Sequence, residues 1–103
     1  MVYVANFYTL RLLRAAKKDG NQDDIVFILK AHGAKVINTT QLKNAFDLLV
    51  LFEGNIFIVE VKQPKGKIRG GQLKCKELVE SAGCKYHVIR TADEALEMIG
   101  KLW

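Results

Sequence analysis

Two nearly continuous apolar runs, residues 46–53 and 56–62, are separated only by Gly54 and Asn55. Apolar segments of this length joined by a glycine and an asparagine predict a β-hairpin with a tight turn. Because almost every position in both runs is apolar, both faces of the hairpin need to be covered by other parts of the protein. The runs therefore predict a layered α/β domain, in which helices flank both faces of a mixed central sheet.

The rest of the chain supplies the helices and further strands. Apolar spacing and turn residues predict helices over residues 7–18, 21–32, 72–82 and 92–102, and strands over residues 34–38 and 86–90. The expected order is α-α-β-β-β-α-β-α. In the third helix, the inward apolar stripe is expected to comprise Cys75, Leu78, Val79 and Ala82. A chain of 103 residues has room for one hydrophobic core, so residues 1–103 are expected to form a single domain.

Three charged residues, Asp47, Glu60 and Lys62, interrupt the hairpin runs. Burying charge is costly, so their presence needs a reason. A two-residue turn at Gly54 and Asn55 would place Asp47 opposite Lys62. Directly paired residues share a face, as do residues two apart on one strand. The three side chains are therefore expected on one face at one end of the hairpin, with roughly 5 to 7 Å between neighbouring Cβ atoms.

Two converging carboxylates repel each other unless a cation lies between them, and Mg²⁺ or Mn²⁺ accepts such oxygen ligands while retaining several waters. A divalent ion of this kind supports attack of water on a phosphate, and the Lys62 ammonium would orient the nucleophile or stabilise developing charge. The alternative is a structural salt bridge from Asp47 to Lys62, with Glu60 reaching solvent. Buried ion pairs rarely add net stability, which weakens this alternative without removing it.

The net charge of +5 is concentrated after the hairpin. Six basic residues occur without an intervening acid: Lys62, Lys65, Lys67, Arg69, Lys74 and Lys76. Such a stretch is typical of a surface that binds a polyanion, although a solvated basic loop is the alternative. Lys65, Lys67 and Arg69 lie in a glycine-containing loop and are placed to contact the phosphates of such a polyanion. Of Lys74 and Lys76, at most one is expected to face the same phosphate backbone.

The order Asp47, hairpin, Glu60-Val61-Lys62 resembles the PD-(D/E)XK nuclease superfamily. The segment EVKQPKGKIRGGQLKCKELVESAGCKYHVIRTADEAL is similar to the virus-type replication-repair nuclease family, VRR-NUC, from its Glu-Val-Lys to its closing Asp-Glu-Ala-Leu. GNQDDIVFILKAHGAKV resembles that family's amino-terminal helix, so the likeness covers about residues 20–100. The resemblance implies a restriction-endonuclease-like αβββαβ core, extended here by the helix over residues 7–18, that cleaves DNA with Mg²⁺ or Mn²⁺.

The resemblance also implies roles for individual residues. Asp47 and Glu60 correspond to metal ligands, the main-chain carbonyl of Val61 to a third ligand, and Lys62 to the catalytic lysine. Gln72 matches the glutamine that begins the following helix near the active site.

Two positions depart from the family pattern. Gln22 occupies a position where the family often has a functional glutamate, and an amide binds metal less well than a carboxylate. Asp23 or Asp24 could substitute only if the helix were rotated. Phe46 stands where the superfamily name has proline, which shapes the entry of the strand and takes no part in the chemistry.

The expected partner is duplex or branched DNA, with no small-molecule cofactor. Small members of the family resemble junction resolvases that act as symmetric dimers, which implies a homodimer cutting four-way junctions, with the first helix or Trp103 at the interface. A nicking or flap nuclease of the same fold and a catalytically silent DNA-binding or regulatory module are the alternatives. The sequence has neither a membrane-spanning run nor a signal-peptide pattern, so we expect a cytoplasmic protein of a bacterial host, with a phage or prophage source.

Overall fold

The computed structural model describes residues 21–102, and the expected first helix and Trp103 lie outside this range. The described elements, in chain order, are α2 (Asn21–Ala31), β1 (Lys35–Asn38), β2 (Leu48–Phe52), β3 (Asn55–Val61), α3 (Gly71–Ser81), β4 (Tyr86–Ile89) and α4 (Ala92–Met98). The strands form one sheet in the order β1-β2-β3-β4. β1, β2 and β3 are antiparallel neighbours, whereas β4 runs parallel to β3.

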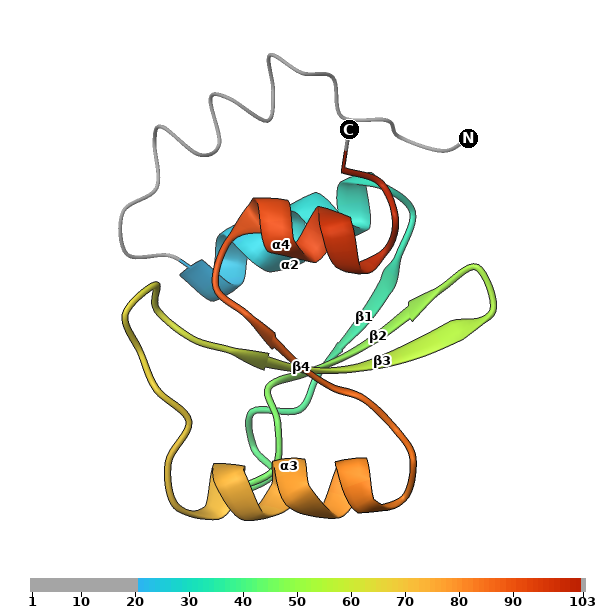
Figure 1. Ribbon diagram of the computed structural model, residues 1–103. Coiled ribbons are helices and arrows are strands. Elements are labelled where there is room, and N and C mark those ends of the chain that lie inside the picture. The colour runs from blue at the N-terminus through green and yellow to red at the C-terminus, as the bar shows by residue number, and fades with distance from the viewer. Residues whose placement is uncertain (1–20, 103) are drawn as a thin grey trace.

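The sheet is covered by helices on both faces, as Figure 1 shows: α2 and α4 lie together on one side and α3 lies on the other. This arrangement confirms the predicted α/β architecture with a mixed central sheet. None of the described helices is long and apolar enough to cross a membrane.

The turn of the β2–β3 hairpin lies one residue earlier than the sequence predicts. Phe52 pairs with Asn55, so Glu53 and Gly54 form the turn, with φ angles of 49° and 82°. Positive φ at both central positions is the type I′ geometry, whose twist suits a tight hairpin, and glycine adopts it without strain. The predicted pairing of Asp47 with Lys62 is therefore wrong.

The shifted register nevertheless leaves the charged side chains on the predicted face. Moving the turn by one residue changes the partner of each β2 residue by two positions on β3, and a shift of two preserves the face. The regular pairing ends at Leu48 and Val59, and the Asp47 N–H bonds to the carbonyl of Val59. Asp47 therefore lies at the end of the ladder, close enough to Glu60 for the two charges to interact.

The main core lies between the sheet and the pair α2 and α4. Alternate residues of β2 and β3 point into it, as the side-chain period of a strand requires. The completely buried side chains of this core are Ile25, Ile28, Leu29, Leu48, Val50, Val59 and Ala95. The buried residues of α2 and α4 recur at helical spacing, so each helix packs one apolar face against the sheet. α4 ends at Met98 rather than at residue 102, because Gly100 takes a φ of 75° and helix carboxyl ends favour this left-handed conformation.

The α3 side of the sheet is less completely covered. No residue of α3 is buried, and Leu78 is 72% exposed. The predicted inclusion of Leu78 and Ala82 in the inward stripe is therefore wrong, because Ala82 is also exposed and follows the end of α3. Gln72, Cys75 and Val79 are the half-buried positions that face the sheet, and Leu78 lies about 100° round the helix from Val79.

Candidate functional site

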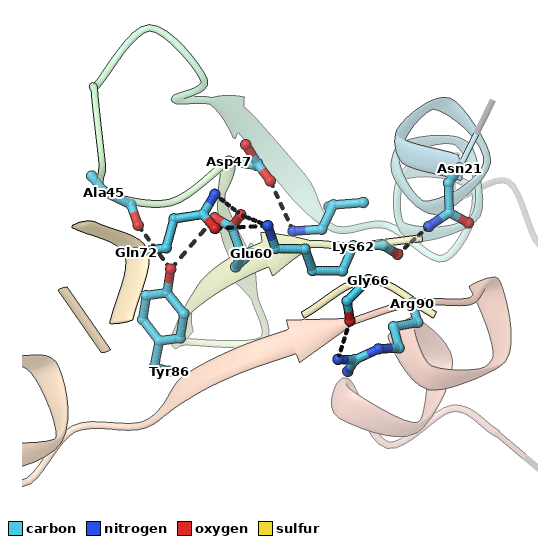
Figure 2. A network of polar contacts seen from close by, with 10 residues as sticks. Asn21, Ala45, Asp47, Glu60, Lys62, Gly66, Gln72, Tyr86 and Arg90 are labelled. Atoms are coloured by element: carbon cyan, nitrogen blue, oxygen red, sulfur yellow. Dashed lines mark hydrogen bonds and ion pairs between the residues drawn. The ribbon is translucent and has the colours of Figure 1, made fainter. Parts of the chain in front are cut away.

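The Glu60 side chain, near the carboxyl end of β3, lies on the α3 side of the sheet. Glu60 is 2% exposed and is the one buried charged residue in the described part of the chain. Tyr86 pairs with Ile58, so Glu60, two residues after Ile58, points to the same face as Tyr86. Figure 2 shows the side chains of Lys62 and Gln72 next to the Glu60 carboxylate.

Gln72 links the anion and the cation of the site. Its Nε2 donates to Glu60 Oε2 at 2.7 Å, and its Oε1 accepts from Lys62 Nζ at 2.7 Å (Figure 2). Lys62 Nζ also lies 3.7 Å from Glu60 Oε2. Only a side chain with both a donor and an acceptor, such as an amide, can satisfy a carboxylate and an ammonium together. The predicted site residues Glu60, Lys62 and Gln72 are therefore in direct contact.

The position of Gln72 depends on a close contact at the start of α3. The side chain of Asn44 packs directly against Gly71, and a Cβ at position 71 would overlap it. Gly71 thus allows the loop before β2 to approach the first turn of α3. This contact fixes the end of the helix from which Gln72 reaches the site.

Asp47 is held beside Glu60 by two hydrogen bonds. Its main-chain N–H donates to the carbonyl of Val59 at 3.0 Å, and its Oδ2 accepts from the N–H of Val61 at 2.9 Å. These two partners flank Glu60 in the sequence. The second bond also brings the Asp47 carboxylate to the main chain of Val61, whose carbonyl is the predicted third ligand.

The site strongly disfavours a second negative charge. Burial raises the pKa of Glu60 to about 7, and the negative charge of Asp47 adds to the effect, while Lys62 and the Tyr86 hydroxyl oppose it without cancelling it. A cation bound between the carboxylates would stabilise the charged form of Glu60 and so offset both causes of the shift. The electrostatics of these residues therefore fit a bound divalent ion.

The donor set fits the same kind of ion. Within residues 21–102 no group of three or more His, Cys, Asp or Glu side chains comes together, so a site rich in protein ligands is not formed there. Asp47 and Glu60 would hold the ion, with the Val61 carbonyl and waters as the remaining ligands. Mg²⁺ binds in this way, through one or two carboxylates and several retained waters.

The assignment of Gln22, the weakest of the predicted ligands, stays a prediction. Gln22 lines a cavity of about 380 Å³ with Asp23, Asn38 and Leu48, and no described contact joins it to Asp47 or Glu60. The neighbouring Asp24 is half-buried on the same helix.

Asn21, the residue before Gln22, contacts the main chain of the site. Asn21 Nδ2 donates to the carbonyl of Lys62 at 2.6 Å and so fixes the main chain of the lysine (Figure 2). Sequence analysis assigned Asn21 no part in the site. No sequence signal links it to a residue 41 positions away.

Tyr86 is a second residue that sequence analysis missed. Its hydroxyl lies 2.8 Å from the carbonyl oxygen of Ala45 and 3.4 Å from Glu60 Oε1 (Figure 2). Burial raises the pKa of Tyr86, and the charge of Glu60 raises it further, so the phenol keeps its hydrogen at neutral pH. The available signal was a tyrosine at the start of a buried strand, because a buried phenol almost always finds a polar partner.

The basic loop after β3 is exposed but anchored. Lys65, Lys67 and Arg69 are exposed, and in the part of the chain that the structure describes none of them forms an ion pair. Arg90 Nη2 donates to the carbonyl of Gly66 at 2.9 Å and ties the loop to the end of β4 (Figure 2).

The two lysines of α3 differ in their contacts. Lys76 is paired with Glu80 at 3.0 Å, whereas Lys74 is exposed. Of the two, Lys74 is therefore the residue available for a phosphate.

A family model described as the nuclease-related domain, NERD, matches residues 9–103 of the chain. No curated protein and no solved structure gives a significant match. The matched segment includes both carboxylates, the Glu-Val-Lys sequence and the basic loop. It confirms the prediction of a nuclease domain, whereas the narrower assignment to the VRR-NUC family stays a prediction.

Proposed function

The chain belongs to the nuclease-related domain family, and from this premise we propose that it is a divalent-metal-dependent endonuclease that hydrolyses DNA phosphodiester bonds. The observation that carries the proposal is the placement of Asp47 beside Glu60, with Lys62 in contact with the Glu60 carboxylate through Gln72. A structural salt bridge between Asp47 and Lys62 explains this arrangement less well. Lys62 contacts Gln72 and Glu60, and the two carboxylates still repel each other.

Each of these residues would have a different role in the reaction. Hydrolysis forms a bond from a water oxygen to phosphorus, breaks the bond from phosphorus to O3′, and leaves a 5′-phosphate and a 3′-hydroxyl. Asp47, Glu60 and the Val61 carbonyl would hold Mg²⁺ or Mn²⁺, which supplies Lewis acidity toward water and phosphate when bound. The Lys62 ammonium donates hydrogen bonds to the attacking water or to the phosphate oxygens. Gln72 keeps that ammonium at a fixed distance from Glu60.

The basic loop would bind the DNA backbone next to the site. Lys65, Lys67 and Arg69 lie a few residues after Lys62 in the chain, and all three are exposed. Lys74 is also exposed, near the start of α3. Contacts of this kind set the position of the duplex without reading its bases.

The preferred substrate, in this proposal, is branched DNA such as a four-way junction, cut by a homodimer in the bacterial cytoplasm. The VRR-NUC resemblance supports this choice. Exposed apolar side chains on the α3 side, among them Ile37 and Ile56 at 49% and 70% exposure, offer a surface for a second copy. A twofold pair would place one site on each of two strands.

The direct test is incubation of the protein with labelled four-way junction, flap and linear duplex in Mg²⁺ or Mn²⁺. We expect the wild type to cleave the junction. The Asp47→Asn and Lys62→Met proteins should cleave it at least about 100-fold more slowly. Glu77→Gln, which neutralises an exposed acid on α3, is the matched control and should cleave like the wild type. Size-exclusion chromatography with light scattering tests the dimer.

The other outcomes separate the alternatives. Cleavage confined to the flap or to one strand of a duplex would replace the junction by a flap or nicking substrate. Binding without cleavage in every metal would identify a silent DNA-binding module. Equal cleavage by the wild type and the Asp47→Asn protein would show that the active site lies elsewhere.

A further inference from the structure

Tyr86 contacts the site without a part in the reaction as described so far. It is 4% exposed and stands at the first position of β4, where it pairs with Ile58. Its side chain lies on the Glu60 face of the sheet. In Figure 2 the phenol oxygen lies between the carbonyl of Ala45 and the carboxylate of Glu60.

The two contacts of the hydroxyl differ in strength. A phenol has one hydrogen to donate. The contact of 2.8 Å to Ala45 has the usual length for an O–H···O bond, whereas the 3.4 Å contact to Glu60 Oε1 is long. The hydrogen is therefore directed mainly at Ala45, and the same oxygen sits against the Glu60 carboxylate.

This geometry connects the two carboxylates through the main chain. Ala45 lies two residues before Asp47, so fixing its carbonyl fixes the segment from which the Asp47 side chain projects. Glu60 is contacted at its other oxygen, Oε2, by Gln72 at 2.7 Å. Gln72 of α3 therefore holds one oxygen of the Glu60 carboxylate, while Tyr86 of β4 lies against the other oxygen and holds the segment that leads to Asp47.

We propose that Tyr86 is a positioning residue for the metal site, whose hydroxyl sets the spacing of the Asp47 and Glu60 carboxylates by tethering the Ala45 carbonyl beside Glu60. The inference rests on the proposed function, because that spacing matters only if a cation binds both carboxylates. Tyr86 itself contacts neither DNA nor metal in this role. Partners of this kind commonly change metal affinity by about 10-fold to 100-fold when they are removed.

The test compares two hydroxyl deletions in the same region. Tyr86→Phe removes the phenol oxygen and keeps the ring. Thr40→Val is the matched control, because the exposed Thr40 hydroxyl donates to the side chain of Asn38 at 2.6 Å and not to a carbonyl of the segment before Asp47. Mn²⁺ affinity is measured by titration calorimetry at fixed pH, and the melting temperature is measured without metal.

We expect Tyr86→Phe to bind Mn²⁺ at least about 10-fold more weakly than the wild type, with Thr40→Val unchanged and both variants melting at similar temperatures. A KM for DNA that stays constant in Tyr86→Phe would support the same conclusion, because the basic loop is intact. Equal losses of affinity in both variants would overturn the inference, since a general loosening of the loop would then explain them.

The two proposals fail in different ways. If the wild type binds Mn²⁺ no better than Asp47→Asn, the metal site is refuted and the role of Tyr86 with it. If the wild type binds the ion, Asp47→Asn does not, and Tyr86→Phe binds like the wild type, only the role of Tyr86 is refuted.

Discussion

On the α2 and α4 side of the sheet, Leu48, Val50 and Val59 are completely buried, whereas on the α3 side Leu49 is half-buried and Ile56 is 70% exposed. The same two strands thus present a closed apolar face and an open face. The open face carries the polar network around Glu60. The difference indicates that one face supplies most of the stability, which allows the other to hold groups that destabilise the fold.

Glu60 is the clearest example of such a group. A buried carboxylate beside a second carboxylate is unfavourable in its charged form, as its raised pKa shows. Enzymes commonly hold groups of this kind where charge is needed for binding or catalysis. Substitutions made on one face at a time therefore test whether the two faces differ in this way.

The largest expected effect is on the closed face. Leu48→Ala should lower the free energy of unfolding by about 2 to 5 kcal/mol, because it leaves a cavity in a core that cannot collapse around it. Urea unfolding followed by circular dichroism measures the change. Leu49→Ala is the matched control, since it is the next residue on the same strand and points to the open face. Similar losses in the two variants would contradict the division of the sheet into two unequal faces.

The next largest expected effect is the pH dependence of the unfolding free energy that Glu60 causes on the open face. The pKa of Glu60 is about 7 in the folded protein against 4.5 for a free glutamate, so the folded state binds the proton more tightly. Stability therefore falls as pH rises from about 4.5 to about 7, by about 3 kcal/mol for this one group. Other carboxylates titrate in this range, so the measured quantity is the difference in unfolding free energy between the wild type and Glu60→Gln.

That difference should decline across the window and level off above pH 7. It should be measured in chelator, because a divalent ion would favour the charged carboxylate. A difference that is constant with pH would show that the Glu60 carboxylate is no harder to ionise in the folded protein than in the unfolded chain.

A slightly smaller effect should follow from adding metal to the open face. At a concentration 100 times its dissociation constant, Mn²⁺ should stabilise the wild type by about 2.7 kcal/mol, because it binds the folded state alone. Thermal unfolding at pH 7 with and without Mn²⁺ measures the shift. Asp47→Asn should show little of it, and Leu49→Ala should keep it. An equal shift in Asp47→Asn would place the bound ion elsewhere on the protein.

The sequence was sufficient to predict the layers of the fold and the face on which the charged residues meet. That face depends only on parity, so it survived the error in the turn. The turn itself was misplaced because Glu53 adopts a positive φ, which non-glycine residues seldom do, and the sequence favoured Gly54 and Asn55 instead.

Other parts of the site depend on contacts that no local pattern contains. Tyr86 meets Ala45, and Asn21 meets Lys62, each across 41 positions of the chain. Helical spacing likewise identified an apolar stripe on α3 but not which sector of it faces the sheet, so Leu78 was assigned to the wrong side. Packing between residues far apart in the sequence decides which side chains meet. The periodicity of a single sequence does not reveal that packing.

The smallest expected effect is on the basic loop at the border of the open face. Replacing Lys65, Lys67 or Arg69 with alanine should change the unfolding free energy by less than about 0.5 kcal/mol, because these side chains are exposed. Each should reduce the slope of log Kd for DNA against log salt concentration by about 1, through the loss of one phosphate contact. Fluorescence anisotropy at several salt concentrations measures this slope. Lys30→Ala, an exposed lysine on α2, is the control and should leave it unchanged. If Lys30→Ala lowered the slope as much as Lys65→Ala, DNA would contact the closed side as well, and the assignment of binding to the open face would fail.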